Sequence, residues 1–265
     1  MAFVHLRTHT EFSVVDGTLR IGDAVAAASA DGQVACAITD LCNLFGTVKF
    51  FSACRAAGIK PLIGCDIWLE PEGTEKQGSR LLLLVQNDAG YLHLCELLAR
   101  AWTSNTQRAQ ALVKWAWLEE LGAGLLALSG ADGGAVGQAL LAGDTVRAEQ
   151  LARRLASAFP ERFFIEVQRA DLASNEAHVR AAVPLAARLS LPVVATHPVQ
   201  YAEPDDFEAH EARVRVAEGE TLANPKRAKL FSREQYFKTQ AQMAALFADL
   251  PVALANTLAV AQRCN

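Results

Sequence analysis

The chain has 265 residues, in which 25 lysines and arginines stand against 29 aspartates and glutamates, so its formal net charge is −4. Hydrophobic residues make up 51% and charged residues 20%, which is typical of a folded domain and excludes a disordered chain. The longest aliphatic run, Leu81 to Val85, is too short to cross a bilayer, and the first residues carry no secretory signal. We therefore expect a cytoplasmic protein with reduced cysteines, no membrane partner and too little positive charge to bind nucleic acid unaided.

Seven short apolar runs predict strands. Most are apolar throughout, as expected of parallel strands that are buried on both faces. The predicted strands are Phe3–Thr8, Ala35–Thr39, Pro61–Leu69, Arg80–Val85, Gly124–Leu128, Phe163–Val167 and Pro192–Thr196.

Alanine-rich helical patterns lie between these strands, with Gly32 and Gly58 placed as left-handed C-caps and Asp144 or Ser174 as N-caps. The alternation predicts an α/β fold with right-handed crossovers. Seven strands fit a barrel of the triosephosphate isomerase type, or a distorted relative, better than the alternative of an open doubly wound sheet. The predicted helices are Ile21–Ala30, Leu44–Ala57, Ala89–Trp102, Ala135–Ala142, Thr145–Ala158 and Glu176–Leu189.

The pattern changes after Tyr201. A helix is predicted from Glu203 to Ala217, and two further helices over Ser232–Ala245 and Pro251–Arg263. We expect one domain over residues 1–265, with a barrel to about residue 202 and a C-terminal helical segment from residue 203.

Polar residues follow or end most of the predicted strands. Because the carboxyl ends of parallel barrel strands meet on one face, where active sites lie, we expect these side chains around one rim. Each could instead cap a helix or a turn. They are His9, Asp40, Asp66, Ser129, Glu166 and His197.

The first predicted strand carries the pattern His5-Leu6-Arg7-Thr8-His9, whose alternate residues share one face. A guanidinium has no lone pair for a metal, so Arg7 would supply positive charge where an ion would otherwise stand. The chain contains no glycine-rich phosphate loop, dinucleotide fingerprint or serine nucleophile elbow. A basic cluster at Lys226–Lys229 is interpreted as a solvated loop.

Several segments together resemble one family: FVHLRTHTEFSVVDG, AITDLCNLFGTVKF, AGIKPLIGCDIWLE, LPVVATHPVQY and the closing LFADLPVALANTLAVAQRCN. This family is the amino-terminal polymerase-and-histidinol-phosphatase (PHP) domain of the bacterial DNA polymerase III alpha subunit. The resemblance runs from Phe3 to Asn265 and implies a distorted (β/α)7 barrel with additional C-terminal helices. The family's domain precedes the polymerase palm, so the resemblance implies a fragment of a DNA-directed DNA polymerase, a nucleotidyltransferase of DNA replication.

Some members of that family carry a metal site of nine ligands, usually zinc, that supports a 3′–5′ exonuclease. Transferred to this sequence, only His9, Asp16 and Asp66 retain a side chain that could coordinate. The two arginines add positive charge, and we expect Arg7 to pair with Asp16, Asp66 or both. The resemblance therefore implies a degenerate site without catalytic residues. The nine positions are Arg7, His9, Asp16, Leu41, Asp66, Arg80, Ala131, Pro198 and Gln200.

The resemblance then implies a non-catalytic module that supports the palm and thumb of its own full-length chain. It would dock the separate proofreading exonuclease (the epsilon subunit) through residues 203–225 or the rim loops, and would touch DNA only indirectly. No cofactor is expected in this domain, since Mg²⁺ belongs to the palm. The alternative is a residual Zn²⁺- or Mn²⁺-dependent phosphoesterase, a pyrophosphatase or 3′–5′ exonuclease. Its site would draw on His9, Asp16, Asp40, Cys65, Asp66, Glu166 and His197.

Overall fold

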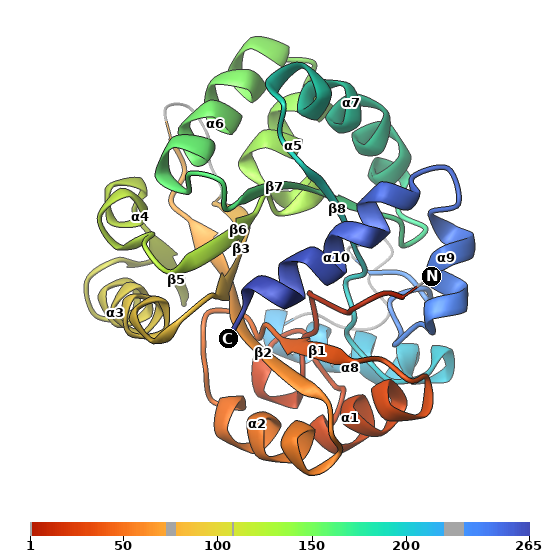
Figure 1. The fold of residues 1–265 in the computed structure, drawn as a ribbon. Coiled ribbons are helices and arrows are strands. Elements are labelled where there is room, and N and C mark those ends of the chain that lie inside the picture. Colours follow the sequence, from red (N-terminus) through yellow and green to blue (C-terminus); the bar gives the residue numbers. More distant parts are fainter. Residues whose placement is uncertain (1, 73–77, 108, 220–230) are drawn as a thin grey trace.

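The computed structural model describes residues 2–72, 78–107, 109–219 and 231–265, and its strands form one mixed sheet (Figure 1). The order is β4-β5-β2-β3-β6-β7-β8, with β1 beside β2. The strands are β1 (Ala35–Ile38), β2 (Lys60–Leu69), β3 (Ser79–Val85), β4 (Thr106–Gln107), β5 (Gln110–Val113), β6 (Leu125–Leu128), β7 (Phe163–Gln168) and β8 (Val193–Thr196).

The N-terminal segment closes this sheet into a barrel. His5 pairs with Cys36 of β1, and Thr8 pairs with Val199, just beyond β8. The amide of His9 also donates to the Val199 carbonyl at 2.9 Å. The predicted strand Phe3–Thr8 therefore lies in its expected place, but the prediction of a regular strand was wrong, because its pairing consists of isolated bridges.

The direction of β3 differs from the prediction. It runs antiparallel to both β2 and β6, whereas β1, β2, β6, β7 and β8 form parallel pairs. The physical reason is the short connection between β2 and β3, since a parallel crossover needs a dozen or more residues. Arg80, at the start of β3, consequently lies at the carboxyl ends of its neighbours rather than at the opposite end of the barrel.

The barrel interior is apolar at one end. Alternate residues of the strands point inward, and Val260 and Ala261 of the last helix, with Cys264 just after it, join the same buried cluster. That helix, α10, crosses in front of the strands in Figure 1. It therefore closes the end at which the parallel strands begin and leaves the other end for polar side chains. The inward strand residues are Val4, Leu6, Ala35, Ala37, Leu62, Leu82, Leu84, Leu126, Leu128, Phe164 and Val194.

Helices surround the barrel, and several of their ends were predicted. Gly32 (φ +67°) and Gly58 (φ +73°) adopt the left-handed conformation behind α1 and α2, and the Asp144 carboxylate caps α6, whereas Ser174 lies inside α7. The short α4, β4 and β5 were not predicted. The helices are α1 (Ile21–Ala30), α2 (Thr47–Ala56), α3 (Asp88–Ser104), α4 (Trp115–Leu121), α5 (Ala135–Leu141), α6 (Thr145–Ala158), α7 (Ala173–Leu189), α8 (Phe207–Glu218), α9 (Gln240–Leu246) and α10 (Pro251–Arg263).

The predicted helix Ser232–Ala245 is wrong in its first half. Ser232 and Gln235 do contact each other as a helix cap would, but Tyr236 pairs with Tyr201 and holds the chain extended. The helix begins only at Gln240, after a capping box formed by Thr239 and Gln242.

Two further expectations concern the membrane and a basic loop. Within the described residues, none of the helices has the length and apolar character needed to span a membrane. The basic cluster Lys226–Lys229 lies outside the described residues, as does the end of the 203–225 segment.

Candidate functional site

The polar end of the barrel follows from the same alternation that fills its interior. On β2 the inward series runs Leu62, Gly64, Asp66, and on β7 Phe164 is followed by Glu166. On the antiparallel β3 the series reverses and starts with Arg80. One carboxylate from each of two parallel strands thus meets a guanidinium from a strand of opposite direction.

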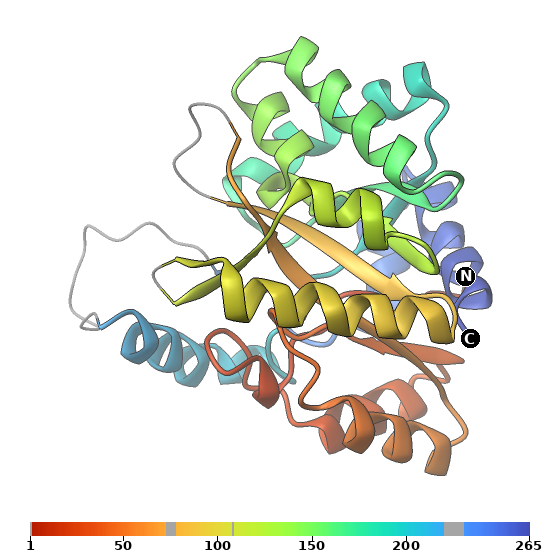
Figure 2. The same ribbon diagram turned by 90° about the vertical axis from the view of Figure 1, so that its left-hand side faces the viewer.

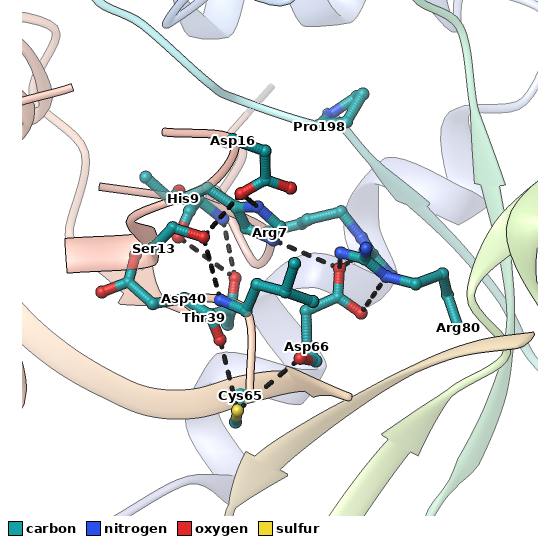
Figure 3. Close-up of polar contacts among 12 residues, drawn as sticks. Arg7, His9, Ser13, Asp16, Thr39, Asp40, Cys65, Asp66, Arg80 and Pro198 are labelled. Carbon is teal, nitrogen blue, oxygen red and sulfur yellow. Dashed lines mark hydrogen bonds and ion pairs between the residues drawn. The ribbon is translucent and has the colours of Figure 1, made fainter. Parts of the chain in front are cut away.

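Asp66 lies at the centre of this group and is fully buried. Arg7 Nη1 donates to its Oδ2, and Arg80 donates through Nε to Oδ1 at 3.2 Å and through Nη2 to Oδ2. His9 Nε2 lies 3.2 Å from the same Oδ2. Figure 3 shows Arg7 and Arg80 converging on Asp66. Three cationic side chains therefore share one carboxylate, and the expected pairing of Arg7 with Asp66 is present.

Arg7 also bridges to Glu166. Its Nε and Nη2 donate to the two oxygens of Glu166 at 2.9 and 3.0 Å, a two-pronged arrangement that fixes the planes of both groups. Glu166 further accepts from the Gly130 amide at 3.0 Å, from Gln168 at 3.0 Å and from the Thr196 hydroxyl. Every member is buried, so Arg7 joins two carboxylates that would otherwise face each other.

Asp16 pairs with His9 rather than directly with Arg7. Its Oδ1 lies 3.0 Å from His9 Nδ1 and accepts from the Ser13 hydroxyl at 2.6 Å. His210 of α8 contacts the Asp16 carbonyl at 2.9 Å. Asp16 is thus held from two sides, and both ring nitrogens of His9 are occupied by carboxylates.

The buried cations remain charged because of these carboxylates. Burial alone lowers the pKa of His9, but Asp16 and Asp66 outweigh it and raise the pKa to about 9. For Arg7, burial is likewise outweighed by Asp66 and Glu166, and its pKa rises further above its usual value. Near neutral pH the site therefore contains a protonated imidazole and two guanidinium groups.

The acidic partners shift in the complementary direction. Burial raises the pKa of Asp66, but Arg7 and Arg80 reverse this and hold the pKa well below its usual range. Burial likewise raises the pKa of Asp16, but the neighbouring His9 outweighs it, and the pKa falls to about 2. Asp40, which accepts from the amide and hydroxyl of Thr10, has its pKa raised by burial to about 6. The cluster is thus internally neutralised without an added ion.

The donor set of this cluster does not fit a metal centre. Both ring nitrogens of His9 contact carboxylates, Asp16 at 3.0 Å and Asp66 at 3.2 Å. The oxygens of Asp66 accept from guanidinium groups, which have no lone pair. Within the described ranges, three or more His, Cys, Asp or Glu side chains are nowhere grouped so as to hold a metal ion.

The remaining predicted positions surround the cluster without joining it. Gln200 Nε2 lies 3.5 Å from His9 Nδ1, and the amide of Leu41 donates to Ser13. Pro198 lies apart from the charged groups in Figure 3. Ala131, in a left-handed conformation, opens the short helical turn Ala131–Gly133 that follows β6. The side chains of Leu41, Ala131 and Pro198 offer no donor or acceptor.

Two of the predicted site residues, His197 and Cys65, contact backbone carbonyls. His197 Nε2 contacts the Glu234 carbonyl at 2.7 Å, and its ring lies 6.3 Å from that of His5. Burial lowers the pKa of His197 to about 3, so it stays neutral. The Cys65 thiol donates to the Asp40 carbonyl at 3.2 Å. It also donates to the Asp66 carbonyl at 3.7 Å, but neither His197 nor Cys65 has a hydrogen bond to the carboxylate of Asp66 or Asp16 among the described contacts.

Sequence reasoning missed several polar members of the cluster. Ser13 carries no signal of its own, whereas Gln168 follows the inward Glu166 by two residues and could have been found from the alternation. Thr196 could have been found, because it follows Val194 by two residues and so points inward. Trp68, whose ring lies 4.6 Å from the Arg80 guanidinium, follows Asp66 by two residues and so continues the same face of β2.

The chain is similar to DNA polymerase III subunit alpha of several bacteria. It is 46% identical over its whole length to the protein of Pseudomonas aeruginosa and covers 23% of that protein. It is 40% identical over 99% of its length to the protein of Escherichia coli K12, again covering 23%, and 45% identical to that of Neisseria meningitidis serogroup B. The chain thus spans about a quarter of the length of the curated relatives that it matches.

Two solved structures share the fold at low identity. An amidohydrolase from Chromobacterium violaceum, with bound sulfate and no metal, superposes with a TM-score of 0.54 and 16% identity over 80% of this chain and 97% of its own. A protein of Bifidobacterium adolescentis assigned to the metal-dependent phosphoesterases gives a TM-score of 0.51 and 15% identity over 74% and 86%. These likenesses support the barrel assignment.

The family model of the PHP domain matches residues 5–170, which contain every charged member of the cluster. The barrel, its closure by the N-terminal segment and this match agree, and the chain belongs to the PHP domain family.

Proposed function

We propose that this chain is the PHP domain of a bacterial replicative DNA polymerase, that it is part of a longer cytoplasmic polymerase chain, and that it performs no chemistry itself. Its role is to support the palm and thumb of that chain and to dock the proofreading exonuclease subunit. The curated relatives, four times longer than this chain, support the first part.

The observation that carries the non-catalytic role is the ion cluster around Asp66. Arg7, Arg80 and His9 place three positive charges where a metal-dependent hydrolase of this family would hold cations. A hydroxide bridged between metal ions would be the nucleophile of such a hydrolase. Here the same carboxylates bind fixed side-chain cations, so the cluster stabilises the barrel instead of activating water.

The test is elemental analysis of the purified, tag-free 265-residue chain, followed by a phosphodiesterase assay with added Zn²⁺ or Mn²⁺. We expect far less than one metal ion per chain and no hydrolysis that depends on metal. About one zinc per chain, with activity lost in His9→Ala, would show a residual metallo-phosphoesterase and overturn the proposal.

The docking role has a separate test. The purified exonuclease subunit of the same organism is titrated against the 265-residue chain by isothermal calorimetry. Saturable binding at a 1:1 ratio is expected, and a flat titration at the highest attainable concentrations would remove docking from the proposal while leaving the structural role.

A further inference from the structure

Exposed aromatic surface is concentrated at one place on the described part of the chain. In the described part of the chain, four aromatic residues have more than a third of their surface exposed. Three of these four belong to this place: Phe45 (72%), Phe51 (50%) and Trp102 (48%). Val48 (77%) and Val14 (57%) accompany them. We call these five residues the rim belt. Val14 follows the short helical turn Glu11–Ser13, Phe45 lies just before α2, Val48 and Phe51 lie in the first half of α2, and Trp102 lies near the end of α3.

Hydrogen bonds tie the three segments of the rim belt together. The Trp102 indole donates to the Cys42 carbonyl at 2.7 Å, which places the end of α3 against the loop that carries Phe45. Asn43 of the same loop donates to the Phe12 carbonyl at 3.0 Å, next to the turn at Val14. The rim belt is therefore one fixed surface rather than scattered side chains, and patches of this kind mark interaction sites.

Backbone strain supports a binding role for the same surface. Val14 has φ 65° and ψ −56°, and the Val15 amide donates to the Ser13 carbonyl at 2.7 Å, which is a γ-turn of the rare, strained form. A β-branched residue in this conformation is unfavourable, and such strain is concentrated at binding sites. The turn presents the Val14 side chain outward.

The charges interleaved with the rim belt define the chemistry of its partner. Lys49, with 58% of its side chain exposed, lies over the Phe12 ring and contacts Glu11 at 3.2 Å. Arg213 of α8 reaches the Val14 carbonyl at 2.9 Å. Two cations against one carboxylate, on a chain of net charge −4, favour a segment that carries acidic groups beside an apolar side chain.

The C-terminus of the chain lies away from the rim belt (Figure 2). The amide of Asn265 donates to the Gln86 carbonyl just after β3, at the barrel end opposite the rim belt. Figure 2 shows both termini on the right, with α8 and the C-terminal end of α3 on the left. In relatives four times longer, the polypeptide that follows therefore starts from the far end of the barrel.

We propose that the rim belt is the surface on which the chain docks its protein partner, and that an apolar side chain flanked by carboxylates in that partner packs against Phe45 and Trp102. The inference rests on the proposed docking function and assigns that function to particular residues. Of the two expected docking regions, residues 203–225 and the rim loops, it selects the rim loops, with Arg213 of α8 beside them.

The test titrates the purified exonuclease subunit against the wild-type chain and against Phe45→Ser and Val48→Ser, with a matched control. Val146→Ser removes an equally exposed valine (68%) from α6, far along the chain from the rim belt. Because central aromatic contacts dominate interface energies, we expect affinity to fall about tenfold or more in Phe45→Ser and to stay unchanged in Val146→Ser. Thermal melting of each variant establishes that it is folded.

Two results would overturn the inference, and they differ. Wild-type affinity in both rim-belt variants would place the docking surface elsewhere and leave the docking function intact. Absence of binding by the wild-type chain would remove docking and rim belt together. A parallel titration with a fluorescent oligonucleotide should show no binding that depends on Phe45, and such dependence would reassign the surface to nucleic acid.

Discussion

Arg7 joins two buried carboxylates, because it contacts both Asp66 and Glu166 from the middle of the barrel. Removing one member of a buried ion network leaves the others charged and unpaired, which costs more than the pair itself contributes. The residue that departs most clearly from a metal-binding pattern is therefore also the one on which the fold depends.

The first prediction concerns this residue. Arg7→Ala should lower the free energy of unfolding in urea by about 3–5 kcal/mol, since two buried carboxylates lose their shared counterion. The control is Arg153→Ala on α6, whose exposed ion pair with Glu149 should contribute less than about 1 kcal/mol. Equal unfolding midpoints for Arg7→Ala and the wild type would refute the structural role of the cluster.

His9 makes a second prediction, about alkaline pH. Its pKa is raised in the folded state from 6.5 to about 9, so its stabilising contribution is complete below pH 6.5 and disappears as the pH rises through 9. At 1.36 kcal/mol per pKa unit the loss is about 3 kcal/mol. The facing groups Asp16 and Asp66 keep their charge over this range, because both have lowered pKa values.

The measurement compares unfolding free energies of wild type and His9→Gln across that range. Their difference should shrink between pH 6.5 and about 9, because the unprotonated imidazole offers little more than glutamine does. His5→Gln is the control, since burial lowers the pKa of His5 to about 4 and its charge does not change in this window. A difference independent of pH would contradict the protonated state of His9.

At the scale of elements, the sequence predicted which segments build the barrel but not the direction of each one. The run Arg80–Val85 is apolar whether it lies parallel or antiparallel, so periodicity carries no information about direction. That direction alone decides that Arg80 reaches Asp66. The strand β5 and the helix α4 were missed because only Lys114 separates them, so no turn signal marks where one ends and the other begins.

For the candidate site, the sequence predicted where several residues lie but not which partners they bind. His9, Asp66 and Glu166 were placed on one rim from their positions at strand ends, and they do meet there. Their individual partners were beyond sequence reasoning, because Asp16 joins through a turn whose shape depends on α8, nearly two hundred residues later.

A second contact between α8 and this turn leads to the third prediction. Arg213 of α8 donates to the carbonyls of Val14 and Glu11 at 2.9 and 3.1 Å and so holds the strained turn. Arg213→Ala should raise amide hydrogen exchange over residues 11–16 about tenfold while changing global stability by less than about 1 kcal/mol. The control is Arg233→Ala, which removes an exposed pair with Glu208 of the same helix. Unchanged amide hydrogen exchange in Arg213→Ala would show that the turn keeps its conformation without Arg213.

At the scale of the whole molecule, the two ends of the barrel have opposite characters. One end is apolar and closed by α10, and the other is charged, with the rim belt beside it. Because Val260 lies in the same buried cluster as Phe164 and Val194, we expect α10 to unfold together with the barrel. The sequence-based division near residue 202 would then separate segments of one cooperative unit, which stays a prediction.

The last prediction tests whether α10 unfolds together with the barrel, by comparing two valines of that helix. Val260 is fully buried in the barrel, whereas Val252 of the same helix is 69% exposed. Val260→Ala should lower the free energy of unfolding by about 2 kcal/mol through lost burial and a residual cavity, and Val252→Ala by less than about 0.5 kcal/mol. Calorimetry should record one transition in both variants, shifted down as a whole in Val260→Ala. If Val260→Ala instead splits the melt in two, α10 folds on its own and only the preceding residues form the barrel unit.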